Sequence, residues 1–262
     1  MNKEMELENK MVDISRRLKA LTDMVTIGNT VADVGCDHGF VSIYLVQNKI
    51  SPAAVAMDVR TGPLERAREH VAMYGLEEQI QTRLSDGLDA FQIGEAQTCI
   101  IAGMGGKLMT KILRKDWKKT NSFRELILQP QSELEEFRVF LRTDGFEIVE
   151  ENMLCEEGKY YFLFKVHPPK SEQDLPAGED LAGDKSLNPM EDELQGLYDR
   201  YGKELLLKAH PVAKEYLLYR RGVLKDIAGN ISGQNNERTA ARHAEVLEEI
   251  QEIEKVLERF FE

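Results

Sequence analysis

The 262-residue sequence lacks any run of 18 or more apolar residues, so no segment of it is typical of a membrane-spanning helix. Residues 1–10 are charged where a secretory signal needs an apolar stretch, and we expect a cytoplasmic protein with no membrane partner. Cysteine is scarce and scattered, at Cys36, Cys99 and Cys155, which favours free thiols over a disulfide framework or a zinc motif. The five histidines are scattered too, and no metal site is predicted.

Positive charge is also in short supply. The formal net charge of −12 argues against a protein that coats nucleic acid indiscriminately, but it leaves room for a local basic surface. Spacings of three and four place most of the cations between residues 107 and 119 on one side of a predicted helix. This segment is either a phosphate-binding surface or an ordinary solvated helix face, and it contains Lys107, Lys111, Arg114, Lys115, Lys118 and Lys119.

From residue 30 to 166, short apolar runs alternate with helix-like segments, as in a parallel sheet covered on both faces. The pattern predicts strands over 31–34, 53–58, 80–85, 98–102, 125–129, 146–154 and 160–166. It predicts helices over 40–48, 63–74, 106–115 and 133–143. Residues 156–159 are too short for a parallel crossover, so the last two strands should form an antiparallel hairpin. The expected fold is an α/β, Rossmann-like sheet of five parallel strands with this terminal hairpin.

The chain divides by composition into three parts. Residues 1–166 form the sheet domain, and residues 167–190 are rich in Pro, Gly, Ser, Asp and Glu, which is typical of a flexible linker. Residues 191–262 carry apolar stripes at helical spacing, broken near Pro211 and Gly229, and predict an antiparallel coiled-coil domain. That helical pair can close within one chain, which favours a monomer, or it can grip a long partner or another copy.

Acidic residues follow three of the predicted strands. The turn from Val34 to Gly39 permits close backbone approach, and the helix after it offers free amides to a carboxylate. Asp33 and Asp37 can accept from an ammonium group, Asp58 stands where ribose hydroxyls bind, and Asp86 can receive an adenine amine. An amino acid, a ribose and an adenine together describe S-adenosylmethionine. Neither the phosphate-binding G-x-x-x-x-G-K-[ST] loop nor G-x-G-x-x-G after the first strand occurs, which disfavours ATP and NAD.

The fourth predicted strand ends in a glycine-rich loop, Ala102-Gly103-Met104-Gly105-Gly106, beside the expected position of the reactive methyl group. Three glycines leave room for a flat ring, or they serve only tight packing of strand against helix. Enzymes that methylate exocyclic amines commonly place Asn/Asp-Pro-Pro-aromatic here. Its absence leaves a ring nitrogen, an oxygen or a small molecule as the target.

Six motifs spread over the sequence resemble those of one family, the bacterial tRNA (adenine-22-N1)-methyltransferases, which are class I S-adenosylmethionine-dependent enzymes. The motifs are Ser15-Arg16-Arg17-Leu18, Asp33-Val34-Gly35-Cys36-Asp37-His38, Gly62-Pro63, Ser85-Asp86-Gly87-Leu88, Ile101-Ala102-Gly103-Met104-Gly105-Gly106 and Leu128-Gln129-Pro130-Gln131. The helical tail also resembles the coiled-coil C-terminal domain of that family.

The resemblance implies methyl transfer from S-adenosylmethionine to ring nitrogen N1 of adenine 22 in tRNA. It implies cofactor contacts at Arg16, Gly35, Asp58, Asp86, Gly87, Gly103 and Met104, to which the residue argument adds Asp33. Asp37 belongs to this narrower family's pattern, and we expect it to act in catalysis by stabilising the cationic product. The tRNA phosphates would bind Lys107, Lys111, Lys115 and Lys118.

Two other functions remain open on the sequence. One is a methyltransferase for a small metabolite, with the helical tail serving dimerisation, which the acidic net charge favours. The other is an interaction protein without enzymatic activity, which would not bind S-adenosylmethionine at all.

Overall fold

The computed structural model describes residues 11–169, 189–231 and 237–262. These residues group into two compact units, one formed by residues 11–151 with 161–169 and the other by residues 152–160 with the helices after 189. Nearly all of the predicted linker, residues 170–188, lies outside the described residues. No helix in the described ranges has both the length and the apolar character needed to cross a membrane.

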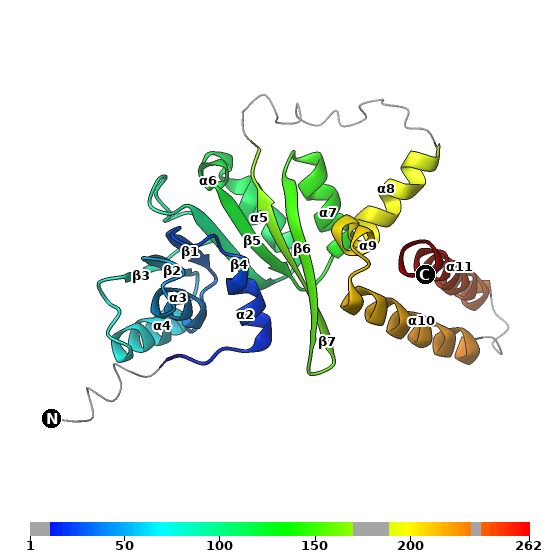
Figure 1. Ribbon diagram of the computed structural model, residues 1–262, viewed down its shortest axis with the longest axis horizontal. Coiled ribbons are helices and arrows are strands. Elements are labelled where there is room, and N and C mark those ends of the chain that lie inside the picture. The colour runs from blue at the N-terminus through cyan, green and yellow to red at the C-terminus, as the bar shows by residue number, and fades with distance from the viewer. Residues whose placement is uncertain (1–10, 170–188, 232–236) are drawn as a thin grey trace. The chain divides into compact units, whose positions relative to one another are not determined.

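A seven-stranded sheet has the strand order β3-β2-β1-β4-β5-β7-β6 and lies at the centre of the first unit, except for the turn end of the β6-β7 hairpin, residues 152–160, which groups with the second unit (Figure 1). β1 to β5 pair in parallel, and β7 pairs with β5 in the antiparallel sense. The predicted parallel sheet and terminal hairpin are therefore confirmed. The strands are β1 (Val31–Val34), β2 (Ala54–Asp58), β3 (Ile80–Leu84), β4 (Thr98–Met104), β5 (Glu125–Pro130), β6 (Glu147–Glu156) and β7 (Lys159–His167).

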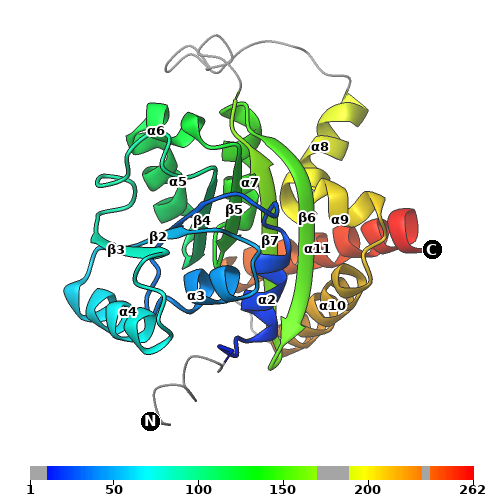
Figure 2. The same ribbon diagram turned by 60° about the vertical axis from the view of Figure 1, so that its left-hand side comes forward.

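Helices cover both faces of this sheet (Figure 2). On one face α3 (Phe40–Gln47) contacts both α2 (Arg16–Asp23) and α4 (Thr61–Met73). A second group consists of α5 (Gly106–Lys115), α6 (Trp117–Ser122) and α7 (Leu134–Thr143). Every residue of β1, β2 and β5 is buried, as expected for parallel strands between two helical layers.

Four helices make up most of the second unit: α8 (Pro189–Tyr201), α9 (Lys203–Leu207), α10 (Pro211–Ile231) and α11 (Glu237–Phe261). α10 and α11 pack along each other around a buried apolar cluster that includes Leu217, Leu224 and Ile253. Lys214 contacts the carbonyl of Phe261, whereas Arg220 lies farther along α10 and contacts Glu249, so the two helices are antiparallel. The helix α10 continues through Gly229 to Ile231, two residues beyond the stop expected from the sequence.

A buried ion pair joins α7 to β6. Arg138 donates through Nε and Nη2 to Oε1 of Glu151 at 2.9 and 2.6 Å, and its guanidinium lies over the rings of Phe162 and Phe164. The two charged side chains are only 2% and 1% exposed. Removal of one partner would leave an uncompensated charge in the interior.

We predict that Glu151→Leu lowers the free energy of unfolding by about 3–5 kcal/mol. The double variant Arg138→Met/Glu151→Leu should recover most of that loss, because no buried charge remains. Urea unfolding of the two variants measures both effects. The control is Asp23→Ala, which breaks the exposed 3.6 Å pair with Lys19 and should cost less than about 1 kcal/mol. Equal losses in the single and double Glu151 variants would contradict this account.

Candidate cofactor and substrate site

The carboxyl ends of β1 to β5 border one cavity of about 590 Å³ in the first unit. Ligands of open α/β sheets bind at this edge of the sheet, where the strand order reverses. The structure brings together here nearly all of the predicted cofactor residues and the predicted catalytic residue. The cavity is lined by Asp33, Gly35, Asp37, Asp58, Asp86, Gly87, Gly103 and Met104.

The turn after β1 needs glycine at its first position. Gly35 has a positive φ of 78°, and a Cβ built on it would lie 2.2 Å from Cε of Met104, so the Met104 side chain covers bare backbone. The amides of Gly35 and Cys36 both donate to the carbonyl of Met57, which holds the turn against β2. The helix α3 then begins after Gly39 without any side chain capping its first amides. These amides are therefore available to an anionic group.

Asp37 occupies a left-handed backbone conformation with φ of 49°. Asp and Asn tolerate this conformation better than other residues with a Cβ, which suits an aspartate to this position. Its carboxylate is 60% exposed, and Oδ2 lies 3.6 Å from Nε2 of His38. The side chain is thus free to meet a second molecule entering the cavity.

Asp58, at the end of β2, is almost fully buried. Its Oδ1 accepts from the amide of Arg60 at 2.9 Å, and its Oδ2 accepts from the amide of Asp37 at 3.2 Å. A carboxylate offers about four acceptor positions, so two remain for ligand hydroxyls.

Asp33 is buried on β1, and its Oδ2 accepts from the Ser42 hydroxyl at 2.8 Å. Burial raises the pKa of the Asp33 carboxyl to about 6, and the hydrogen bond from Ser42 opposes this shift in part. The group therefore gains or loses its charge close to neutral pH. A ligand ammonium next to it would favour the ionised form.

The loops after β4 and β5 are hydrogen-bonded to each other. The amide of Gln131 donates to the carbonyl of Met104 at 2.8 Å, and the amide of Gly106 donates to the carbonyl of Ser132 at 3.1 Å. A Cβ on Gly106 would lie 2.7 Å from that Ser132 carbonyl, so this glycine serves packing. Gly103 has φ of 77° and lines the cavity. Tight packing is thus seen at Gly106, and room for a flat ring beside Gly103 stays a prediction.

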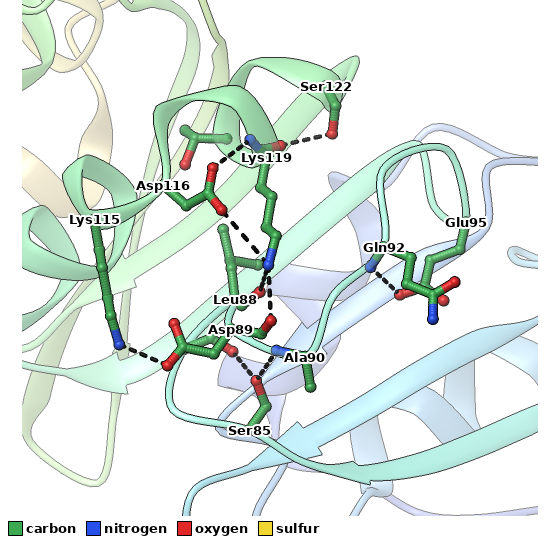
Figure 3. Close-up of polar contacts among 12 residues, drawn as sticks. Ser85, Leu88, Asp89, Ala90, Gln92, Glu95, Lys115, Asp116, Lys119 and Ser122 are labelled. Atoms are coloured by element: carbon green, nitrogen blue, oxygen red, sulfur yellow. Dashed lines mark hydrogen bonds and ion pairs between the residues drawn. The ribbon is translucent and has the colours of Figure 1, made fainter.

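The predicted basic segment does not form one continuous helix. The helix α5 ends at Lys115, and Asp116 starts the new helix α6 by accepting from the amide of Lys119. Acidic groups already engage several of the cations (Figure 3). Lys115 binds Asp86 and Asp89 at 3.1 and 2.7 Å, and these contacts raise the pKa of Lys115.

The remaining cations of this segment differ in their contacts. Arg114 holds both carboxylate oxygens of Asp144, and Lys119 donates to the carbonyls of Leu88 and Asp89. Lys107, Lys111 and Lys118 are exposed. Several of these cations bind groups that are distant in sequence. The spacing of residues along one helix does not reveal such partners.

Arg16 does not line the cavity, whereas its neighbour Arg17 does. Consecutive helical residues point about 100° apart, so only one of the two arginines at the start of α2 can face the sheet edge. Arg17 donates to Oε1 of Gln129 at 2.8 Å and lies over the ring of Tyr161. The sequence named Arg16 of this motif as a cofactor contact, and the arginine of the motif that lines the cavity is Arg17.

Sequence reasoning also assigned no site role to His38, Phe40 or Gln131, which line the same cavity. The Phe40 ring stacks on His70 at 4.6 Å, and Nδ1 of His70 lies 2.9 Å from the carbonyl of His38. Gln131 belongs to the Gln-Pro-Gln motif, which was the available signal for it.

Comparison with known proteins identifies the fold and the relatives. A family model described as "Methyltransferase domain" matches residues 14–164. A tRNA (adenine(22)-N(1))-methyltransferase of Bacillus subtilis is 34% identical over 148 residues, which is 56% of this chain and 62% of that enzyme. The chain thus aligns with slightly under two thirds of this curated relative's length.

Solved structures match over more of the chain. A putative tRNA (m1A22) methyltransferase of Streptococcus pneumoniae is 30% identical with a TM-score of 0.78, covering 94% of this chain and all of that one. A structure described in the same words, in complex with S-adenosyl-L-methionine, has a TM-score of 0.75 with the same identity and coverage. The m1A22 tRNA methyltransferase of B. subtilis is 26% identical with a TM-score of 0.73, covering 94% of this chain and 99% of that one.

Proposed function

This chain belongs to the bacterial tRNA (adenine-22-N1)-methyltransferase family of class I S-adenosylmethionine-dependent enzymes, and we propose that it methylates N1 of adenine 22 in tRNA. The observation that carries this proposal is that aspartates at the ends of neighbouring strands surround one cavity. The chain that contains this cavity also matches the whole length of the S. pneumoniae protein. That match favours tRNA over a small metabolite as the substrate. A tRNA substrate also implies that the enzyme works in the cytoplasm.

The cavity residues fit S-adenosylmethionine by their chemistry. Asp33 would bind its ammonium group, the first amides of α3 its carboxylate, Asp58 its ribose hydroxyls and Asp86 its adenine amine. Asp86 shares Lys115 with Asp89, so its carboxylate is already oriented at the cavity wall. When bound, this cofactor supplies an electrophilic methyl group on a sulfonium sulfur.

The chain needs no general base for the transfer. N1 of adenine carries an in-plane lone pair and no proton, so the residues around it have to align the base, exclude water and stabilise the positive charge that the product acquires. We assign the last task to Asp37, since its carboxylate is accessible from the cavity while its backbone amide donates to Asp58. The exposed Lys107, Lys111 and Lys118 are suited to contact phosphates, and Lys115 could join them by leaving Asp89.

Incubation of an unmodified tRNA transcript with the protein and S-adenosylmethionine should yield 1-methyladenosine, detected by mass spectrometry of the digested nucleosides. Primer extension should stop at position 22, because a methyl on N1 blocks base pairing there. A parallel incubation with a metabolite extract tests the small-molecule alternative. Cofactor binding without any methylated nucleoside would contradict the proposed substrate.

Affinity for S-adenosylmethionine should fall with acidification, because only the ionised form of Asp33 binds an ammonium group well. The pKa of about 6 belongs to the free protein, so between pH 7 and pH 5 calorimetry should show affinity weakening by about tenfold. The Asp33→Asn variant should bind S-adenosylmethionine weakly at both pH values, and most of this pH dependence should be lost. If Asp33→Asn kept the full pH dependence of this affinity, Asp33 would not be the residue that binds the ammonium group.

Asp37→Asn should reduce the single-turnover rate of methyl transfer by about tenfold or more, because it removes the charge that stabilises the cationic product. Asn keeps the left-handed backbone accessible, so the affinity for the cofactor should change less than about twofold. Asp37→Gly is the matched control for the backbone, and it should be as slow as the Asn variant. Turnover at the wild-type rate in both variants would exclude a catalytic role for Asp37.

A further inference from the structure

Two glutamines at the end of β5, Gln129 and Gln131, differ in burial and in hydrogen bonding. Gln129 is 1% exposed, and its amide is fully engaged, since Oε1 accepts from Arg17 and Nε2 donates to the carbonyl of Pro130. Gln131 is exposed and lines the cavity. Within the described part of the chain, its side-chain amide makes no hydrogen bond.

The backbone of Gln131 is nevertheless fixed. Its amide donates to the carbonyl of Met104, and the adjoining Ser132 carbonyl accepts from Gly106. Nε2 of its side chain lies 3.7 Å from the place where a Cβ on Gly103 would stand, so the amide group lies beside bare backbone of the glycine-rich loop. A polar side chain with an anchored backbone and an unused amide is suited to recognise a ligand.

The sheet order puts Gln131 on the substrate side of the cavity. β3 and β2, which carry the residues proposed for the adenine and ribose of the cofactor, lie on one side of β1, whereas β4 and β5 lie on the other. Asp86 and Gln131 therefore border the cavity from opposite ends. Under the proposed function, the target base would therefore enter next to Gln131.

An enzyme that methylates N1 cannot bind the base through N1. The adenine edge that stays available presents the N6 amine as a donor and N7 as an acceptor, and a glutamine amide matches this pair with two hydrogen bonds. Guanine offers acceptors at both positions, so it would face the amide oxygen with a carbonyl. The amide of Gln131 has the donor and the acceptor that this recognition needs.

We propose that Gln131 selects the target adenine by its N6–N7 edge, with Oε1 accepting from N6 and Nε2 donating to N7, which leaves N1 open for methylation. This inference rests on the proposed function. It assigns Gln131 a specificity role that is separate from catalysis and from cofactor binding.

The test compares wild type with Gln131→Ala on three tRNAs that carry adenosine, purine riboside or 7-deazaadenosine at the target position. Single-turnover rates should fall about tenfold in Gln131→Ala on adenosine, within the range of a paired contact. Loss of N6 or of N7 should slow the wild type by a larger factor than it slows the variant, because the variant no longer contacts either group. Gln131→Glu keeps an acceptor and loses the donor, so it should stay sensitive to N6 and become insensitive to N7.

Two controls make the outcome specific. Gln131→Ala should bind S-adenosylmethionine as tightly as wild type in calorimetry, and Gln92→Ala, an exposed glutamine outside the cavity, should match wild type on all three tRNAs. Equal slowing of wild type and Gln131→Ala by each analogue would overturn the inference while leaving the proposed function intact. Failure of wild type to methylate the adenosine tRNA would overturn both.

Discussion

The buried carboxylate of Asp58 is the interaction on which the rest of the site depends. One oxygen binds the amide of Arg60 on its own loop, and the other binds the amide of Asp37 on the loop after β1. Two neighbouring strand ends are thereby joined at a fixed spacing, and Asp37 is held in its left-handed conformation. Loss of this carboxylate would release the turn and also remove the proposed ribose contact, so a substitution of Asp58 would not separate the two effects.

The opposite wall of the cavity is built by backbone rather than by charge. Close approach of the loops after β4 and β5 requires Gly106, and the Met104 side chain can lie over the β1 turn only because Gly35 has no Cβ. Glycine at these places lets three loops contact one another directly. Gln131 has a fixed position as a consequence, although its own side chain is unpaired within the described residues.

Local patterns were sufficient for most of the fold and for the acidic strand ends. Fully buried apolar runs such as Ala54–Asp58 bounded by turn residues identify parallel strands, and parallel strands necessarily bring their carboxyl ends to one edge. The sequence could not reveal that Asp116 interrupts the basic segment, because an aspartate inside a helical pattern is also common. The sequence also could not show that Arg17 rather than Arg16 lines the cavity, because this depends on how α2 lies against the sheet. The partners of Arg114 and Lys115 lie on other parts of the fold, so residue spacing along the sequence cannot predict them.

The ion pairs of this acidic protein limit how strongly it could bind RNA through phosphate contacts. On the second unit Arg220, Arg221 and Lys225 of α10 pair with Glu249 and Glu254 of α11, and on the first unit Lys115 pairs with aspartates. Exposed pairs of this kind stabilise a fold by less than about 1 kcal/mol each, so a phosphate can replace the carboxylate at little cost. The displaced carboxylate then repels the RNA, which limits the net gain from each exchange. If the chain acts on tRNA as proposed, phosphate contacts alone would therefore bind it weakly, and the proposed recognition of the base inside the cavity would supply much of the selectivity.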